Sequence, residues 1–255
     1  MYLLLAALLL AQPTPAVAIE PMVAIIIDDL GYSRTRGMRA INLPARLTYA
    51  MIPDTQYAAS LARYAHDAGK EVMIHLPMEN NANLPMSRIA LTGNLAPEDI
   101  RNILDKAVSR VPFATGINNH MGSSLTQQPE AMSWLMDSVK QRQLFFVDSR
   151  TTPKTIASHI ARQKNIHTAS RDIFLDNERN HHAIDLQFQT MMKMARQKRS
   201  IVAIGHPYPA TLDYLELALP MLESEGIRVV PVSEVISARL AGQQVATGTA
   251  STGAE

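Results

Sequence analysis

The chain has 255 residues, of which 47% are hydrophobic and 18% are charged, so it can bury a sizeable core and is neither disordered nor low-complexity. Its 24 Lys and Arg against 23 Asp and Glu, with no basic stripe, argue against a nucleic-acid partner and against polybasic attraction to a membrane. The absence of cysteine excludes disulfides, thiolate metal sites and cysteine nucleophiles, which leaves His, Asp and Glu as metal ligands.

The first segment of the chain predicts export. Residues 3–11 form a short apolar run, and Ala-Val-Ala at residues 16–18 fits a signal-peptide cleavage site, although no Lys or Arg precedes the run. A run of this length is too short for a bilayer core, which needs about 20 apolar residues. We therefore expect a signal peptide over residues 1–18, a periplasmic or secreted protein and no permanent membrane span. A buried N-terminal helix is the alternative.

From residue 19 to residue 240, short apolar runs rich in β-branched residues alternate with segments of helical periodicity, which is typical of a parallel α/β domain. The predicted strands are residues 23–27, 47–52, 71–75, 115–118, 144–147, 167–169, 201–205 and 228–232. Seven or eight such units predict a single domain with a distorted (β/α)7–8 barrel fold, and an open doubly wound sheet is the alternative. Residues 241–255 lack periodicity and are predicted to be disordered.

Polar side chains stand at or just after the ends of several predicted strands. They are Asp28, Asp29, His75, His120, Asp148 and His206. Each one alone has a plain structural explanation, such as capping a loop. In a barrel of parallel strands, however, the carboxyl ends of the strands meet on the face that holds the active site. One Asp with two His would leave coordination positions open for water and substrate, as a catalytic metal site requires.

Five ordered segments resemble the divergent polysaccharide deacetylase family. They are residues 27–32, 74–79, 116–123, 146–150 and 203–211. The resemblance covers residues 22–236. The family itself resembles a distant branch of the metal-dependent polysaccharide deacetylases. It implies a distorted barrel, a divalent metal ion, with Zn²⁺ as the expected ion, and an acetylated glycan or polysaccharide as the substrate.

The resemblance also implies roles for individual residues. Asp28 matches the catalytic base, Asp29 and His75 match metal ligands, and His206 matches the general acid, which we expect Asp148 to hold in place. The second metal histidine of the family lies four residues after the first, where this chain has Glu79.

We expect His120 to take the vacant ligand position, because Zn²⁺ sites favour imidazole. Glu79 is the alternative ligand. The Arg-Pro loop of the family is replaced by an Asn-Asn-His loop, in which Asn119 could orient the loop or contact substrate. Arg150 could supply a nearby cation.

The sequence thus predicts a metal-dependent hydrolase that removes acetyl groups from an envelope glycan. Two other classes stay open. The first is a catalytically inactive envelope factor that binds a glycan or a protein. The second is a metal-free glycosidase that uses two carboxylates, such as Asp29 with Glu79 or Asp148.

Overall fold

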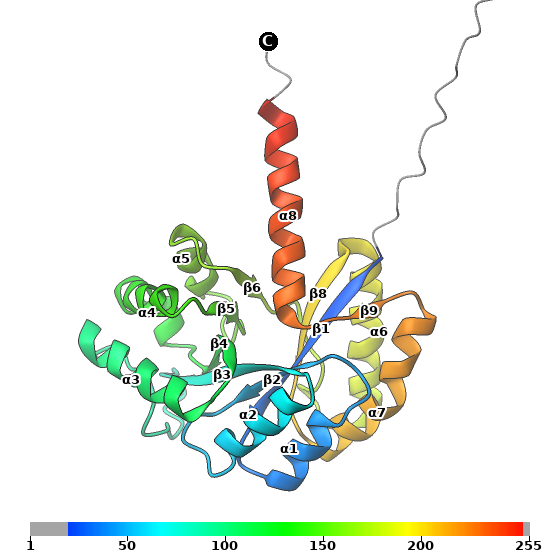
Figure 1. Ribbon diagram of the computed structural model, residues 1–255, viewed down its shortest axis with the longest axis horizontal. Coiled ribbons are helices and arrows are strands. Elements are labelled where there is room, and N and C mark those ends of the chain that lie inside the picture. The colour runs from blue at the N-terminus through cyan, green and yellow to red at the C-terminus, as the bar shows by residue number, and fades with distance from the viewer. Residues whose placement is uncertain (1–19, 252–255) are drawn as a thin grey trace, which may run out of the picture.

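The computed structural model describes residues 20–251, so the predicted signal peptide at residues 1–18 lies outside the described residues. Within this range the chain forms strands β1 (Met22–Leu30), β2 (Thr48–Met51), β3 (Glu71–Met78), β4 (Ala114–Met121), β5 (Phe145–Asp148), β6 (Thr168–Ser170), β7 (Ile173–Phe174), β8 (Ser200–Gly205) and β9 (Arg228–Val229). The helices are α1 (Arg34–Ile41), α2 (Ala58–Asp67), α3 (Pro97–Arg110), α4 (Pro129–Gln141), α5 (Ala157–Gln163), α6 (His181–Lys198), α7 (Pro209–Ser224) and α8 (Val232–Ser251), with a short 3₁₀ helix, η1 (Leu125–Gln127). Figure 1 shows the helices α1 to α7 arranged around the outside of a strongly curled sheet.

The strands pair in the order β6-β5-β4-β3-β2-β1-β8-β7, with β9 on β1, and every pair is parallel. The two ends of this order, β6 and β7, are joined by only Arg171 and Asp172. The Arg171 N–H donates to the Asp148 carbonyl on one side at 2.9 Å, and the Asp172 N–H donates to the Val202 carbonyl on the other at 2.8 Å. Because β6 and β7 act as one bent strand that changes partner, the ring closes. The structure confirms the distorted barrel over the open sheet.

Two apolar cores follow from the alternation of side chains along each strand. On β1, Val23 and Ile25 pack outward against the helices, whereas Ala24 and Ile26 point into the barrel. Side chains at the start of α8, including Val235, join the inner core. This helix therefore closes the end of the barrel at which the strands begin.

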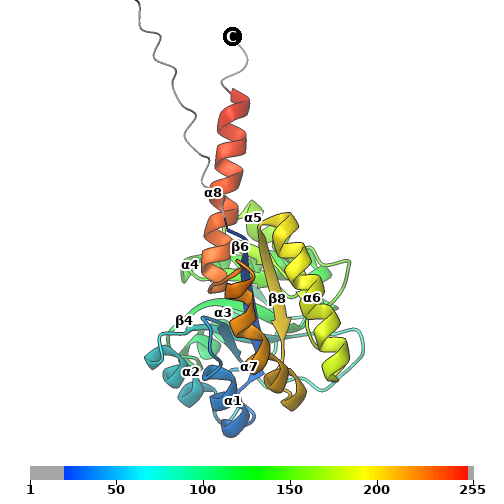
Figure 2. The ribbon, with the colours of Figure 1, turned by 90° about the vertical axis from the view of Figure 1, so that its right-hand side faces the viewer.

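Helix α8 then continues away from the barrel as far as Ser251 (Figures 1 and 2). The sequence predicts disorder from residue 241, whereas residues 241–251 form the end of α8 in the structure, and residues 252–255 lie outside the described part of the chain. Helical periodicity could not reveal this segment, because a helix that leaves the domain has no core toward which to turn an apolar face. Within residues 20–251, no helix is long and apolar enough to cross a membrane.

Candidate metal centre

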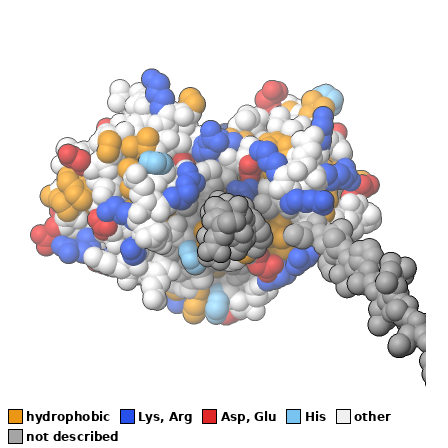
Figure 3. All heavy atoms as spheres, turned by 90° about the horizontal axis from the view of Figure 1, so that it is seen from above, with side chains coloured by type: hydrophobic (Ala, Val, Ile, Leu, Met, Phe, Trp, Pro, Cys, Tyr) orange, Lys and Arg blue, Asp and Glu red, His pale blue; other side chains and the backbone are white. Residues whose placement is uncertain are grey.

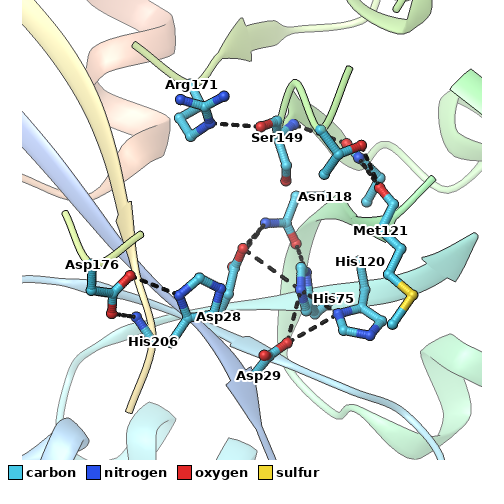
Figure 4. Close-up of polar contacts among 12 residues, drawn as sticks. Asp28, Asp29, His75, Asn118, His120, Met121, Ser149, Arg171, Asp176 and His206 are labelled. Carbon is cyan, nitrogen blue, oxygen red and sulfur yellow. Dashed lines mark hydrogen bonds and ion pairs between the residues drawn. The ribbon is translucent and has the colours of Figure 1, made fainter. Parts of the chain in front are cut away.

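The two aspartates at the end of β1 reach the same site because the strand is irregular there. Successive side chains of a regular strand point to opposite faces. The register of β1 against β2 shifts between Ile27 and Leu30, and Asp29 adopts a left-handed backbone conformation with φ of 56°. Asp tolerates this conformation better than most residues. The irregularity turns the Asp29 carboxylate toward the strand ends, beside that of Asp28 (Figure 4).

Asp29, His75 and His120 converge at the carboxyl ends of β1, β3 and β4 (Figure 4). The Asp29 Oδ1 atom lies 3.3 Å from His75 Nε2 and 3.0 Å from His120 Nδ1. The two imidazole nitrogens are 3.1 Å apart. Three potential ligand atoms thus share one small space, although their residues are up to 91 positions apart in the sequence.

This arrangement fits a small divalent cation. Tetrahedral ligands with bonds of about 2.0 Å lie about 3.3 Å from one another, which is close to the three separations in the site. The Asp29 Oδ1 atom is buried and has no hydrogen bond of regular geometry to any described residue, as expected for an atom whose natural partner is a metal ion. Burial alone would raise the pKa of Asp29, but His120 and His75 hold this pKa well below its usual value.

Asn118 orients two members of the site at once. Its Oδ1 atom lies 2.7 Å from His75 Nδ1, and its Nδ2 group donates to both oxygens of Asp28, at 2.8 and 3.1 Å. Since the amide oxygen can only accept, His75 carries a proton on Nδ1, so Nε2 is the ring nitrogen that could bind a metal. The sequence suggested only a loop-orienting role for the asparagines. The position of Asn118 inside β4 could have indicated more, because a buried polar residue in a strand needs hydrogen-bond partners.

Asp28 is almost completely buried, at 2% exposure. Burial raises its pKa, and the neighbouring positive charges of His75 and His206 and the hydrogen bond from Asn118 oppose this effect only in part. The pKa of the buried His75 is raised as well, because the charges of Asp28 and Asp29 outweigh the effect of burial, which would lower it. Figure 4 shows Asp28 between His75 and His206.

His206, which follows β8, is held by Asp176 rather than by Asp148. The His206 Nδ1 atom lies 2.8 Å from Asp176 Oδ1, and the His206 backbone N–H donates to Asp176 Oδ2 at 2.7 Å. The Thr211 hydroxyl donates to the same Oδ2 atom at 2.8 Å. Burial would lower the pKa of His206, but Asp176, Asp28 and Asp29 raise it to about 9, so the imidazole is protonated at neutral pH.

The choice of Asp148 as the partner of His206 was therefore wrong. The Asp148 carboxylate instead accepts hydrogen bonds from the backbone N–H of Arg150 at 2.9 Å and from the Thr155 hydroxyl at 3.0 Å, which fixes the loop after β5. Asp176 escaped the sequence analysis because it follows β7, and a strand of two residues is too short to show alternation.

Three further predicted residues lie apart from the metal ligands. Glu79 Oε2 accepts the Gly93 N–H at 2.7 Å, so its carboxylate ties down the loop after β3. The Asn119 amide bridges the Ser149 N–H and the Met121 carbonyl, at 2.8 and 2.7 Å. Arg150 is exposed and lines a different cavity.

Two tyrosines that are far apart in the sequence meet beside Asp29. Tyr32 and Tyr208 line a pocket of about 120 Å³ that also includes Asp29 and Arg36. Tyr32 is 63% exposed, and Tyr208 lies next to His206, with ring centroids 5.4 Å apart. Flat aromatic side chains at the entrance of such a site suit a ligand with an apolar face. The sequence could not predict this pair, because the pairing of the two loops depends on β1 lying beside β8.

The fold and the site together define a (β/α) barrel protein with a candidate mononuclear metal centre at the carboxyl ends of its strands. A model of the divergent polysaccharide deacetylase family matches residues 25–236. The chain therefore belongs to this family, which confirms the resemblance found in the sequence.

Two uncharacterized proteins are similar to this chain, one in sequence and the other in fold. The chain is 37% identical over 210 residues to the uncharacterized protein YibQ of Escherichia coli K12; the match covers 82% of this chain and spans only 65% of the length of YibQ. The uncharacterized protein ATU2773 of Agrobacterium tumefaciens C58 shares the fold, with a TM-score of 0.81 at 20% identity over 86% of this chain and 90% of that chain.

Two members of carbohydrate esterase family 4 share the fold more distantly. One is the Streptomyces lividans esterase in complex with acetate, with a TM-score of 0.54, 16% identity and coverage of 83% of this chain and 93% of that chain. The other is the Bacillus anthracis pseudoenzyme BA3943, with a TM-score of 0.52, 14% identity and coverage of 85% and 66%. An esterase and a pseudoenzyme have the same architecture, so the fold alone does not decide whether a chain is active.

Proposed function

We propose that this protein is a metal-dependent hydrolase that removes acetyl groups from an envelope glycan. The observation that carries this proposal is the convergence of Asp29 Oδ1, His75 Nε2 and His120 Nδ1, which lie no more than 3.3 Å from one another. The buried carboxyl group of Asp28 and the protonated His206 lie next to them. One carboxylate and two imidazoles form a ligand set that suits Zn²⁺ and leaves a coordination position open. A bound divalent cation supplies polarisation of a carbonyl group and a lower pKa for water at the site.

Asp28 is the proposed general base. It lies beside the ligands, since its Oδ2 atom is 3.6 Å from His75 Nε2. Asn118 fixes the orientation of the carboxylate, and the raised pKa of Asp28 brings this group closer to neutral pH, where a base transfers protons more effectively. In the proposed reaction, Asp28 accepts a proton from the water that attacks the acetyl carbon.

His206 is the proposed general acid. Asp176 binds the Nδ1 side of its ring, so the Nε2–H group is the one free to donate to the substrate. The pKa of about 9 keeps this proton on the ring at neutral pH. When the bond between the acetyl carbon and the sugar nitrogen or oxygen breaks, His206 protonates the leaving atom, and the products are acetate and the free amine or hydroxyl group.

We also propose that the protein acts in the periplasm or outside the cell. The apolar leader at residues 3–11 and the absence of cysteine support this location. An acetylated envelope glycan would be accessible there. Fractionation of cells that express the full chain, followed by N-terminal sequencing of the processed protein, tests the location and the cleavage site.

Metal content and acetate release together test the reaction. We expect the purified protein to bind one Zn²⁺ per chain and to release acetate from N-acetylglucosamine oligomers. His120→Ala should lose the metal and the activity. Asp28→Asn should keep the metal but lower the rate by about 10²- to 10⁴-fold. His182→Ala is the matched control, because His182 is exposed at the start of α6.

The outcomes separate the three classes of function. Bound metal without acetate release from any acetylated oligomer would contradict the hydrolase and favour a binding factor. Glycan cleavage in the absence of metal would favour a glycosidase. If His120→Ala leaves the metal content unchanged, His120 is not a metal ligand.

A further inference from the structure

Four arginines gather around one cavity that has no part in the proposed reaction. The cavity has a volume of about 200 Å³ and lies between β6, α5 and the second turn of α8. Its arginines are Arg150, Arg162, Arg171 and Arg239, and we call it the arginine cavity. Figure 3 shows Lys and Arg side chains gathered around α8 on the face from which this helix projects.

Positive charge exceeds negative charge among the residues that line the arginine cavity. Among the described residues that line it, Asp172 is the only acidic one. This carboxylate already binds Arg239 Nη2 at 2.7 Å and Lys198 Nζ at 3.4 Å. Since the whole chain carries a formal charge of only +1, the excess of arginine here is a local feature and does not reflect a basic protein.

Arg171 is held firmly inside this positive environment. Its Nε group donates to the Ser149 carbonyl at 2.7 Å and its Nη2 group to the Arg150 carbonyl at 2.9 Å, while its guanidinium carbon lies 3.7 Å from the centre of the Phe174 ring. Burial lowers the pKa of Arg171, and the charge of Arg150 lowers it further, while the charges of Asp148, Asp172 and Asp28 oppose this effect in part. A bound anion would reduce the remaining repulsion between these two cations.

The two exposed arginines keep free hydrogen-bond donors. Arg150 has a left-handed backbone, with φ of 49°, and its backbone N–H and carbonyl are both occupied. Its guanidinium, however, donates to none of the described residues. Arg162 has a single long hydrogen bond, to the Ser158 hydroxyl at 3.4 Å. Both planar groups are therefore available to an oxyanion, which they match in charge and geometry.

We propose that the arginine cavity binds a phosphate group. A phosphate carries up to two negative charges and offers oxygens in several directions, which suits guanidinium groups from different elements better than a single carboxylate does. The cavity accommodates one small anion, so the ligand is a phosphate or the phosphate end of a larger molecule. The sources with this chemistry are a soluble phosphate ester and an anionic phospholipid headgroup.

Nuclear magnetic resonance of the full chain with inorganic phosphate, at constant ionic strength, tests this site. We expect saturable shifts of the arginine side-chain signals. Combined R150Q and R162Q substitution should weaken phosphate binding by at least about tenfold, because charge-assisted hydrogen bonds are lost. Both residues are exposed, and thermal unfolding checks that the variant folds. The matched control combines R63Q with R88Q, which removes two exposed arginines outside the cavity.

Each outcome decides the proposal. The proposal is overturned if phosphate causes no shifts of the arginine signals. It is also overturned if the double substitution leaves phosphate binding unchanged, which is the result expected if phosphate binds at the metal centre instead. Acetate that binds as tightly as phosphate overturns the preference for phosphate. If the site binds phosphate, sedimentation with phosphatidylglycerol vesicles, with phosphatidylcholine vesicles as the reference, identifies the source. Sedimentation that depends on both arginines indicates a lipid headgroup, and phosphate binding without sedimentation indicates a soluble ester.

Discussion

Replacement of Asp176 by Asn is expected to lower the pKa of His206 from about 9 to 6.5 or below. Asp176 provides the hydrogen bond and the nearest negative charge that raise this pKa. Without that charge, burial of the imidazole lowers the pKa of His206. The charges of Asp28 and Asp29 offset part of this fall. Since one pKa unit corresponds to about 1.4 kcal/mol, the rise from the ordinary value of 6.5 to about 9 represents about 3 kcal/mol of stabilisation of the protonated ring.

This energy appears as a pH dependence of the free energy of unfolding. A histidine whose pKa is higher in the folded than in the unfolded protein stabilises the fold fully below pH 6.5, and the contribution is lost as the pH rises through about 9. The stability difference between the wild type and Asp176→Asn should therefore be about 3 kcal/mol larger at pH 6 than at pH 9.5. A constant cost of about 1–3 kcal/mol adds to both values, because Asn cannot accept all three hydrogen bonds.

The assay is a titration of the His206 imidazole by nuclear magnetic resonance, together with urea unfolding at the two pH values. EDTA keeps the site free of metal, so that Asp28 and Asp29 retain their charges. Asp213→Asn serves as the control, since Asp213 is an exposed acid on α7. A pKa of His206 that stays near 9 in Asp176→Asn would refute the assignment of Asp176 as the partner that charges this ring.

Three further expectations concern the site and its supporting turn. Asn118→Ala should lower the free energy of unfolding in urea by about 2–4 kcal/mol, because it leaves two buried groups without partners. The same substitution should lower the metal affinity about 10- to 100-fold in a metal titration. Unchanged values would contradict the bridging role of Asn118. Asp28→Asn in EDTA should unfold at higher urea than the wild type at pH 8, with the difference shrinking as the pH falls, since burial disfavours the ionised carboxylate. Gly31→Ala should lower the free energy of unfolding by at least about 1 kcal/mol more than Gly69→Ala, and so lower the melting temperature further. The reason is that a Cβ at Gly31 would lie 1.8 Å from a threonine hydroxyl, whereas one at Gly69 meets nothing within 4 Å. Equal melting temperatures for the two alanine variants would argue against this steric constraint.

The arginine cavity lies close enough to the metal centre for the two to share supporting contacts. Arg171 donates to the Ser149 carbonyl (Figure 4). The Ser149 N–H donates to Asn119, which is next to His120 in the chain. The same loop after β5 therefore supports both sites. A ligand in the arginine cavity would contact a residue that helps to hold this loop in position.

The sequence by itself predicted the barrel and the polar residues at the carboxyl ends of its strands. Apolar runs of four to six residues mark strands, and helical periodicity marks the segments between them, because each element must bury one face. Parallel strands connected by helices necessarily present their carboxyl ends on one side. For this reason Asp28, Asp29, His75, His120 and His206 could be assigned to one rim, although they are distant from one another along the chain.

Tertiary structure alone decided the partners of these residues. Asp176 follows a strand of two residues, which carries no pattern, and its contact with His206 exists only because β7 lies beside β8. The role of Asn118 depends on its register opposite His75. The arginine cavity joins the ends of several elements, and α8 extends beyond any apolar pattern. Hydrophobic burial is encoded locally and repeats with a period, whereas hydrogen bonds and charge clusters depend on register and on contacts between distant segments, which no local pattern specifies.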